Sequence, residues 1–274
     1  MSLSLGKLKL DGKSHVMGIL NVTPDSFYDG GWHFDNANSQ RRIEEMIAQG
    51  TEIIDIGGES TRPGSKPVTI DEELKRVIPA IKFISEISDI PISIDTQKAE
   101  VARKAVEAGA CVVNDVGGLR NTEMIQAIAD MQVPVIIMHM QGTPENMQTN
   151  PQYDNTVQDI KDWLEVRIKA AKMAGIKRSN MIVDPGIGFG KNLAQNIEIM
   201  QNIHQFKIKK CGVLLGASRK SWISGIDKSD VNNRLGGSIA SALYCYKKGV
   251  NMFRVHDVKE TYQALKVYKK ICLM

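Results

Sequence analysis

Eight short apolar runs, each followed by a segment that favours helix, most constrain how this chain of 274 residues can fold. The clearest is Met181-Ile182-Val183, which is too short for a helix and passes directly into Asp184 and a glycine-rich segment. Runs of this kind are typical of buried parallel strands. The predicted strands lie near residues 16–20, 52–56, 91–94, 111–113, 133–138, 181–183, 212–216 and 251–256.

The connecting segments predict a closed barrel. Helices are expected over 38–49, from 71, and over 97–108, 121–131, 155–174, 194–205 and 232–248, with a last helix from 257. Helical crossovers make neighbouring strands parallel, and eight parallel strands close a TIM barrel. We therefore predict an α/β fold, a single (β/α)8 TIM barrel over residues 1–274 with a short N-terminal β ribbon. A doubly wound open sheet is the alternative, but it needs two edge strands, and none of the runs looks like one.

Composition excludes several classes of function. The formal net charge is only +4 and the basic residues are scattered, which argues against nucleic-acid binding. No apolar run approaches the roughly 20 residues of a membrane helix. The four cysteines are far apart and form no Cys-x-x-Cys pair, and we expect no signal peptide; they are Cys111, Cys211, Cys245 and Cys272. These features predict reduced thiols and a cytoplasmic protein.

Polar side chains stand where the predicted strands end. In a barrel the C-terminal strand ends meet at one mouth, so these side chains should converge. Burying unpaired charges costs several kcal/mol each, so structure alone would not select such a set. We interpret two members as structural: Asp55, as a polar residue satisfied by backbone, and His139, as a packed and hydrogen-bonded histidine between two methionines. The full set is Asn21, Asp55, Asp95, Asn114, His139, Asp184, residues 218–220, Arg254 and His256.

The chemistry of this set favours a flat heterocycle with an anionic tail. Asp95, Asn114 and Asp184 offer acceptors and an amide that suit the guanidine-like edge of a pterin. Positive charge and donors for phosphate or carboxylate are expected from Lys220, Arg254, Arg62 and His256.

Competing sites fit the sequence less well. The glycines after Asp184 fail the Walker pattern, because position 185 is proline and position 192 is asparagine, and their spacing is one residue short for a dinucleotide fingerprint. No His-x-His follows the first strand, as a metal-dependent hydrolase of this fold usually needs. Lys220 keeps Schiff-base chemistry open.

Several longer motifs resemble the dihydropteroate synthase family. They are MGILNVTPDSF at 17–27, GGESTRPG at 57–64, SIDT at 93–96, DPGIGFGK at 184–191, SRKS at 218–221 and RVHD at 254–257. The match runs from near residue 15 to the last helix, in the family's order. The resemblance implies a pterinylmethyl transferase of folate biosynthesis, which joins p-aminobenzoate to 6-hydroxymethyl-7,8-dihydropterin diphosphate and releases diphosphate.

The resemblance also implies roles for individual residues. Asp95, Lys220 and Arg254 are expected to be catalytic, in an SN1-like substitution. The expected pterin-binding residues are Asp95, Asn114, Met138, Asp184, Lys220 and Arg254. The diphosphate is expected on Asn21, Thr61, Arg62, Arg254 and His256, with Mg²⁺ on Asn21. The p-aminobenzoate pocket, where sulfonamides would compete, is expected from Phe27, Thr61, Pro63, Phe189 and Ser221.

The partners implied are these small-molecule substrates and a second copy of the chain in a homodimer, without nucleic acid or membrane. Two alternatives stay open at this point. A methyltetrahydrofolate methyltransferase shares the barrel and the pterin edge but does not need the phosphate contacts. A non-catalytic pterin-binding paralogue would release no diphosphate.

Overall fold

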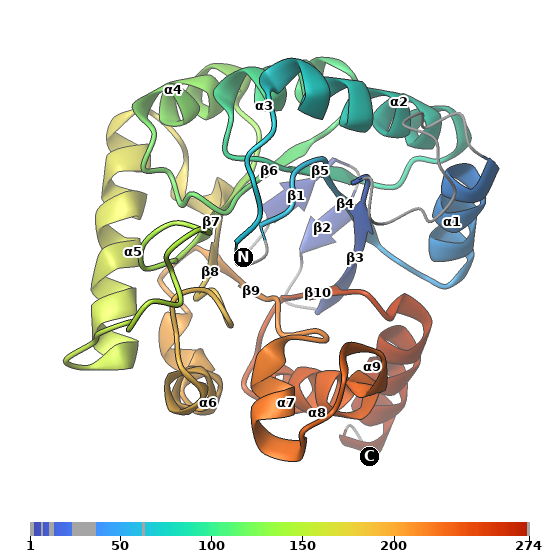
Figure 1. Cartoon of the computed structure of the whole chain (residues 1–274). Coiled ribbons are helices and arrows are strands. Elements are labelled where there is room, and N and C mark those ends of the chain that lie inside the picture. The colour runs from blue at the N-terminus through green and yellow to red at the C-terminus, as the bar shows by residue number, and fades with distance from the viewer. Residues whose placement is uncertain (1–2, 7, 11–13, 24–36, 62–63, 273–274) are drawn as a thin grey trace.

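The computed structural model describes residues 3–6, 8–10, 14–23, 37–61 and 64–272. Eight parallel strands close into a barrel in the order β10-β3-β4-β5-β6-β7-β8-β9, with helices around the outside (Figure 1). The predicted TIM barrel is confirmed. Its strands are β3 (His15–Asn21), β4 (Ile53–Gly57), β5 (Ile92–Asp95), β6 (Val112–Asp115), β7 (Val135–Met138), β8 (Met181–Asp184), β9 (Gly212–Leu215) and β10 (Met252–Val255).

The helices begin and end close to the predicted positions. At the start of α2, the Thr69 side chain accepts a hydrogen bond from Glu72 N, and the acidic residues 71–73 lie where the helix dipole favours them. The helices are α1 (Ala37–Ala48), α2 (Ile70–Ile87), α3 (Ala99–Glu107), α4 (Thr122–Met131), α5 (Thr156–Met173), α6 (Leu193–Gln201), α7 (Ser221–Asp227), α8 (Leu235–Lys247) and α9 (Val258–Cys272). The short α7 was not predicted. Among the described residues, no helix is long and apolar enough to cross a bilayer.

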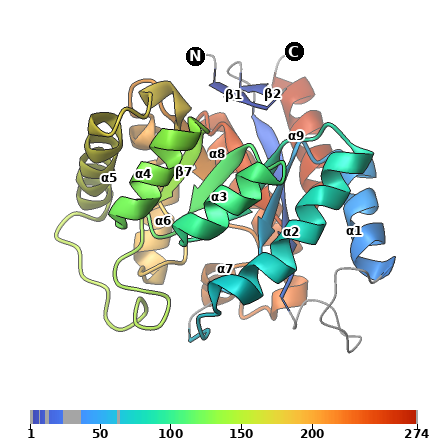
Figure 2. The ribbon, with the colours of Figure 1, turned by 90° about the horizontal axis from the view of Figure 1, so that it is seen from above.

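The predicted N-terminal ribbon is present. Strands β1 (Leu3–Leu5) and β2 (Leu8–Leu10) pair antiparallel, and Leu5 is fully buried. It packs into an apolar cluster with inward-facing residues of the barrel strands, among them Met17, Ile53 and Met252. Figure 2 shows the ribbon at one end of the barrel and α7 at the opposite end. The ribbon therefore closes the end of the barrel that lies away from the polar strand ends.

The barrel interior has two layers, because residues two apart on a strand face the same side. The lower layer is the apolar cluster that contains Ile53, Ile182 and Met252. Two residues further along the same strands stand polar side chains, which must also face inward. The upper layer that results includes Asp55, Asp95, Asn114, Asp184 and Arg254.

Candidate active site

Arg254 lies at the centre of the polar layer and contacts acids from two other strands. Its Nε donates to Asp55 Oδ2 at 2.5 Å, and its Nη2 donates to Asp95 Oδ2 at 2.6 Å. Asn114 Nδ2 donates to the same Asp55 oxygen at 3.1 Å. The register places Asp95 beside Asn114 on adjacent strands. Asp95, Asn114 and Arg254, three of the predicted site residues, thus lie together.

Asp55 corrects the sequence-based interpretation. We expected its carboxylate to be satisfied by backbone, but Oδ2 accepts from the side chains of Asn114 and Arg254. The reason is its place on β4, two residues beyond the inward-facing Ile53, which puts it in the polar layer. Asp55 is a residue of the site, and the alternation along β4 is the signal that could have revealed it.

The acids of this layer are buried and have free acceptor capacity. Burial raises the pKa of Asp95 to about 7; the positive charge of Arg254 opposes this rise, and the negative charge of Asp55 adds to it. Within the described part of the chain, Oδ1 of Asp55 and Oδ1 of Asp95 are buried without a hydrogen-bond partner. Unpaired buried acceptors are costly, so they indicate a place where a ligand with donors binds.

Asp184 and Lys220 both lie close to a glycine, Gly216. Burial raises the pKa of Asp184, while the charge of Lys220 lowers it, and its Oδ1 accepts from Gly186 N at 2.7 Å. Burial also lowers the pKa of Lys220 to about 8, although Asp184 opposes this. A Cβ built on Gly216 would lie 3.6 Å from Asp184 Oδ2 and 3.8 Å from Lys220 Nζ. The missing side chain leaves space between acid and ammonium.

Phe189 and Met138 border the same region. Lys220 Nζ lies 4.3 Å from the centroid of the Phe189 ring and donates to the carbonyl of Ile187. Met138 is buried in a cluster with Val116 and two further methionines, against which Phe189 packs. The site therefore has an apolar wall next to Lys220.

His256 differs from the expectation of a positive charge. Burial, followed by the nearby charge of Arg254, lowers its pKa to about 4, so the ring is neutral at pH 7 in the free protein. Its Nδ1 lies 3.2 Å from Ser218 Oγ. Neutral His256 still offers hydrogen bonding to an anion, but it does not offer charge.

His139 is packed and hydrogen-bonded, as predicted. It is buried, and its Nδ1 lies 3.0 Å from Nζ of Lys191, a buried lysine that the sequence-based reasoning did not single out. Lys191 Nζ also donates to Phe189 O at 2.8 Å, and burial lowers its pKa well below the usual value. Lys191 thus holds the backbone of the glycine-rich loop rather than a ligand.

The other predicted residues have different placements. Asn21 ends β3, and its Oδ1 would lie 3.6 Å from a Cβ on Gly57. Thr61 is half-buried after β4, and Ser221 is exposed at the first position of α7. Among the described residues, no three His, Cys, Asp or Glu form a group that could hold a metal ion. Phe27, Arg62 and Pro63 lie outside the described residues.

Comparison with known proteins agrees with the family resemblance of the sequence motifs. A family model described as pterin binding enzyme matches residues 17–256. The dihydropteroate synthase of Escherichia coli K12 is 42% identical over 253 residues, which are 92% of this chain and 90% of that protein. The chain belongs to the dihydropteroate synthase family.

Two solved structures of this family are similar in fold. The Yersinia pestis dihydropteroate synthase, in a sulfonamide drug complex, has a TM-score of 0.93 and 39% identity, covering 100% of both chains. The Xanthomonas albilineans enzyme with 4-aminobenzoic acid has a TM-score of 0.93 and 40% identity, covering 100% of this chain and 98% of that one. The resemblance and the transferase class predicted from the motifs are confirmed.

Proposed function

We propose that this chain joins 6-hydroxymethyl-7,8-dihydropterin diphosphate to p-aminobenzoate, with the polar layer of the barrel as its pterin site. The observation that carries the proposal is the set of buried acids and an amide facing Arg254 at one end of the barrel. Family membership supports the reaction, and the 4-aminobenzoic acid bound to the Xanthomonas albilineans relative supports the second substrate.

The pterin ring is proposed to bind edge-on to the acids. Asp95, Asn114 and Asp184 would accept and donate hydrogen bonds along its nitrogen-rich edge, where Asp95 Oδ1 has no partner among the described residues. Lys220, whose Nζ also lies close to Gly216, would donate to the ring. Arg254, fixed between two carboxylates, would present the flat face of its guanidinium to the ring. Met138 would pack against the bound heterocycle.

The diphosphate is proposed to lie at the mouth, on Asn21, Thr61, Arg62, Arg254 and His256. His256, which is neutral in the free protein, would donate a hydrogen bond, and the negative charge beside it would raise its pKa. Asn21 supplies one amide oxygen, and Mg²⁺ commonly takes most of its ligands from phosphate and water. This donor set fits Mg²⁺, which when bound would neutralise charge on the leaving group.

The p-aminobenzoate is proposed to lie between the loops after β3, β4 and β8 and the start of α7. Its pocket would be formed by Phe27, Thr61, Pro63, Phe189 and Ser221, and sulfonamides would compete for it. Phe189 supports this placement, because its ring lies against the Lys220 side chain at the edge of the pterin site.

The substitution is proposed to be SN1-like. The methylene–oxygen bond breaks as diphosphate leaves with the electron pair, and the dihydropterin ring spreads the positive charge left on the methylene. Ionised Asp95 would stabilise that cation electrostatically, and Lys220 and Arg254 would hold the ring in place. The neutral arylamine nitrogen then forms the new bond to the methylene and releases one N–H proton to solvent, so positioning matters more than a strong base.

A diphosphate-release assay with both substrates, with chromatography of the product, tests the proposal. We expect one diphosphate and one dihydropteroate per turnover, and Asp95→Asn should lower turnover strongly. Absence of release would indicate the non-catalytic paralogue. Binding of the pterin without linked binding of diphosphate and Mg²⁺ would indicate the methyltransferase. A single domain over 1–274, a homodimer and a cytoplasmic location stay predictions.

A further inference from the structure

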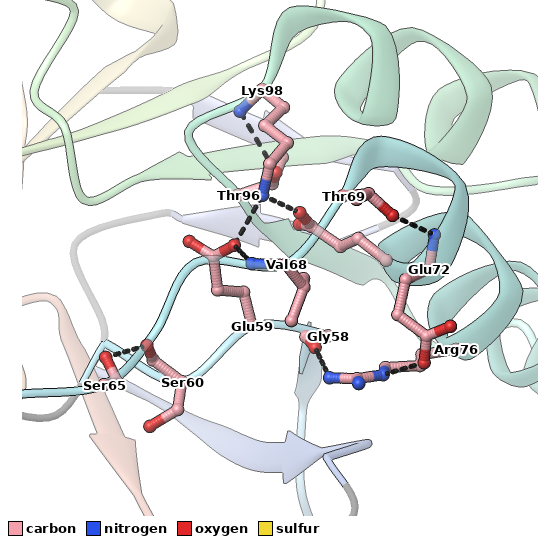
Figure 3. A network of polar contacts seen from close by, with 11 residues as sticks. Gly58, Glu59, Ser60, Ser65, Val68, Thr69, Glu72, Arg76, Thr96 and Lys98 are labelled. Atoms are coloured by element: carbon pink, nitrogen blue, oxygen red, sulfur yellow. Dashed lines mark hydrogen bonds and ion pairs between the residues drawn. The ribbon is translucent and has the colours of Figure 1, made fainter. Parts of the chain in front are cut away.

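The loop between β4 and α2 is tied together at its base by one carboxylate. Glu59 Oε2 accepts from Val68 N at 2.8 Å, so residues near the two ends of the loop are held side by side (Figure 3). The loop leaves the barrel beside the site, since a Cβ on Gly57 would lie 3.7 Å from Asp95 Cβ. Thr61, proposed to contact the diphosphate, lies in this loop.

Lys98 connects the Glu59 carboxylate to helix α2. Its Nζ lies 2.6 Å from Glu59 Oε2 (Figure 3). The same Nζ lies 2.5 Å from Oε2 of Glu73, which is fully buried on α2. Lys98 itself stands three residues after Asp95, and its backbone N donates to Thr96 Oγ1 at 3.2 Å. The Lys98 ammonium thus joins the loop to α2, and the Lys98 backbone belongs to the turn that follows Asp95.

Packing fixes the start of the loop onto α2. A Cβ on Gly58 would lie 2.8 Å from Val77 Cγ1 and 3.0 Å from Glu73 Cγ, so no side chain fits there. The Gly58 carbonyl accepts from Arg76 Nη1 at 2.8 Å. Gly58 is packed against α2, and the next residue, Glu59, is held by both Lys98 Nζ and Val68 N, so its contact with Lys98 contributes to the direction in which the loop continues.

The positive charge of Lys98 keeps the carboxylates of Glu59 and Glu73 close together. Burial lowers the pKa of Lys98, but its hydrogen bonds to Glu59 and Glu73 outweigh this and raise it above the ordinary value. Without the ammonium, two carboxylates would face each other at a partly buried position, and like charges repel. Glu59 would then move away from Glu73, and Thr61 would move with it.

We propose that Lys98 is a positioning residue for the diphosphate half of the site, which sets the β4–α2 loop through Glu59 and Glu73. The inference rests on the proposed function, because it assigns the loop to the diphosphate. The inference separates two halves of one ligand. The pterin ring is proposed to bind in the barrel layer, to which the Lys98 side chain donates no hydrogen bond among the described residues, whereas the diphosphate is proposed to depend on the loop.

Calorimetry and kinetics with Lys98→Met and Lys98→Arg test the inference. The control is Lys104→Met, because Lys104 lies on α3, the helix that begins directly after Lys98, and is exposed and paired with Glu107. With Lys98→Met we expect KM for the pterin diphosphate, and Kd for diphosphate with Mg²⁺, to rise about tenfold or more. Binding of 6-hydroxymethyl-7,8-dihydropterin should stay within twofold, Lys98→Arg should restore most of the loss, and Lys104→Met should match the wild type.

Glu59→Met provides a second variant if Lys98→Met does not fold, since it breaks the link to the loop but leaves the Lys98–Glu73 pair intact. It should reproduce the selective loss of diphosphate binding. Unchanged diphosphate binding in a folded variant, or an equal loss of pterin and diphosphate binding, would overturn the inference while the wild type stays active. A wild type without diphosphate release would overturn the proposed function and this inference with it.

Discussion

Replacing Asp55 with asparagine should move the pH dependence of pterin binding. Burial raises the pKa of Asp95 to about 7 in the free protein, with the charge of Arg254 opposing the rise and the charge of Asp55 adding to it. Below that pH Asp95 is protonated, and its Oδ1 no longer offers a carboxylate acceptor to the N–H edge of a pterin. Pterin affinity should therefore rise with pH through about 7 in the wild type and level off above it.

The expected shift follows from the arrangement around Arg254. Asp55 and Asp95 accept from Nε and Nη2 of the same guanidinium, at 2.5 and 2.6 Å, so the two carboxylates are close neighbours. At an effective dielectric constant of about 20, unit charges about 4 Å apart interact by about 4 kcal/mol, so a carboxylate somewhat further away contributes on the order of one to two pKa units. Asp55→Asn keeps the shape and removes the charge, so the pKa of Asp95 should fall by one to two units, as a rough range.

The assay is calorimetric titration with 6-hydroxymethyl-7,8-dihydropterin between about pH 5 and pH 9, because this ligand has no phosphate that titrates in the range. Asp55→Asn also replaces the charge-assisted hydrogen bond between Arg254 and residue 55 by a neutral one, which costs about 1 kcal/mol. The pterin affinity of the variant at high pH, where it no longer changes with pH, should therefore be severalfold lower than that of the wild type. Asp130→Asn, an exposed carboxylate on α4, should behave as the wild type. In Asp55→Asn the rise of pterin affinity with pH should occur at lower pH than in the wild type. A rise at the same pH, or at higher pH, would refute the reasoning.

Three further predictions concern other parts of the molecule. Gly216→Val should lower pterin affinity about tenfold or more in titrations, because the new side chain fills the space between Asp184 and Lys220; unchanged affinity would contradict this use of the space. Leu5→Ala should lower the free energy of unfolding in urea by about 2–5 kcal/mol with unaltered KM values, since Leu5 is buried at the opposite end of the barrel. Chelation of Mg²⁺ should weaken binding of the pterin diphosphate but not of the pterin alone, and equal effects on both would argue against a metal held by the diphosphate.

The barrel and its polar mouth are predictable from sequence because both depend on local patterns. Short apolar runs such as 181–183 identify strands, and the polar residue at the end of each run identifies the mouth once the strands are known to be parallel. The seven-residue helix α7 was missed because a helix this short, with Gly225 inside it, has no apolar period to detect.

The contacts inside the site are less predictable, because barrel closure creates them. Asp55 and Arg254 lie 199 positions apart in sequence, and only the closed sheet brings them together. From the sequence alone Lys191 is an ordinary loop lysine, and only the folded barrel shows that it is buried against His139. The charge of His256 likewise depends on burial next to Arg254, which no sequence spacing shows.

The most direct test is a crystal structure of the complex with 6-hydroxymethyl-7,8-dihydropterin diphosphate and Mg²⁺. We predict that the nitrogen-rich edge of the ring contacts Asp95, Asn114 and Asp184, with Arg254 on its face and the diphosphate directed outward to Asn21 and His256. A ring bound elsewhere, or a diphosphate pointing into the barrel, would contradict the proposed site.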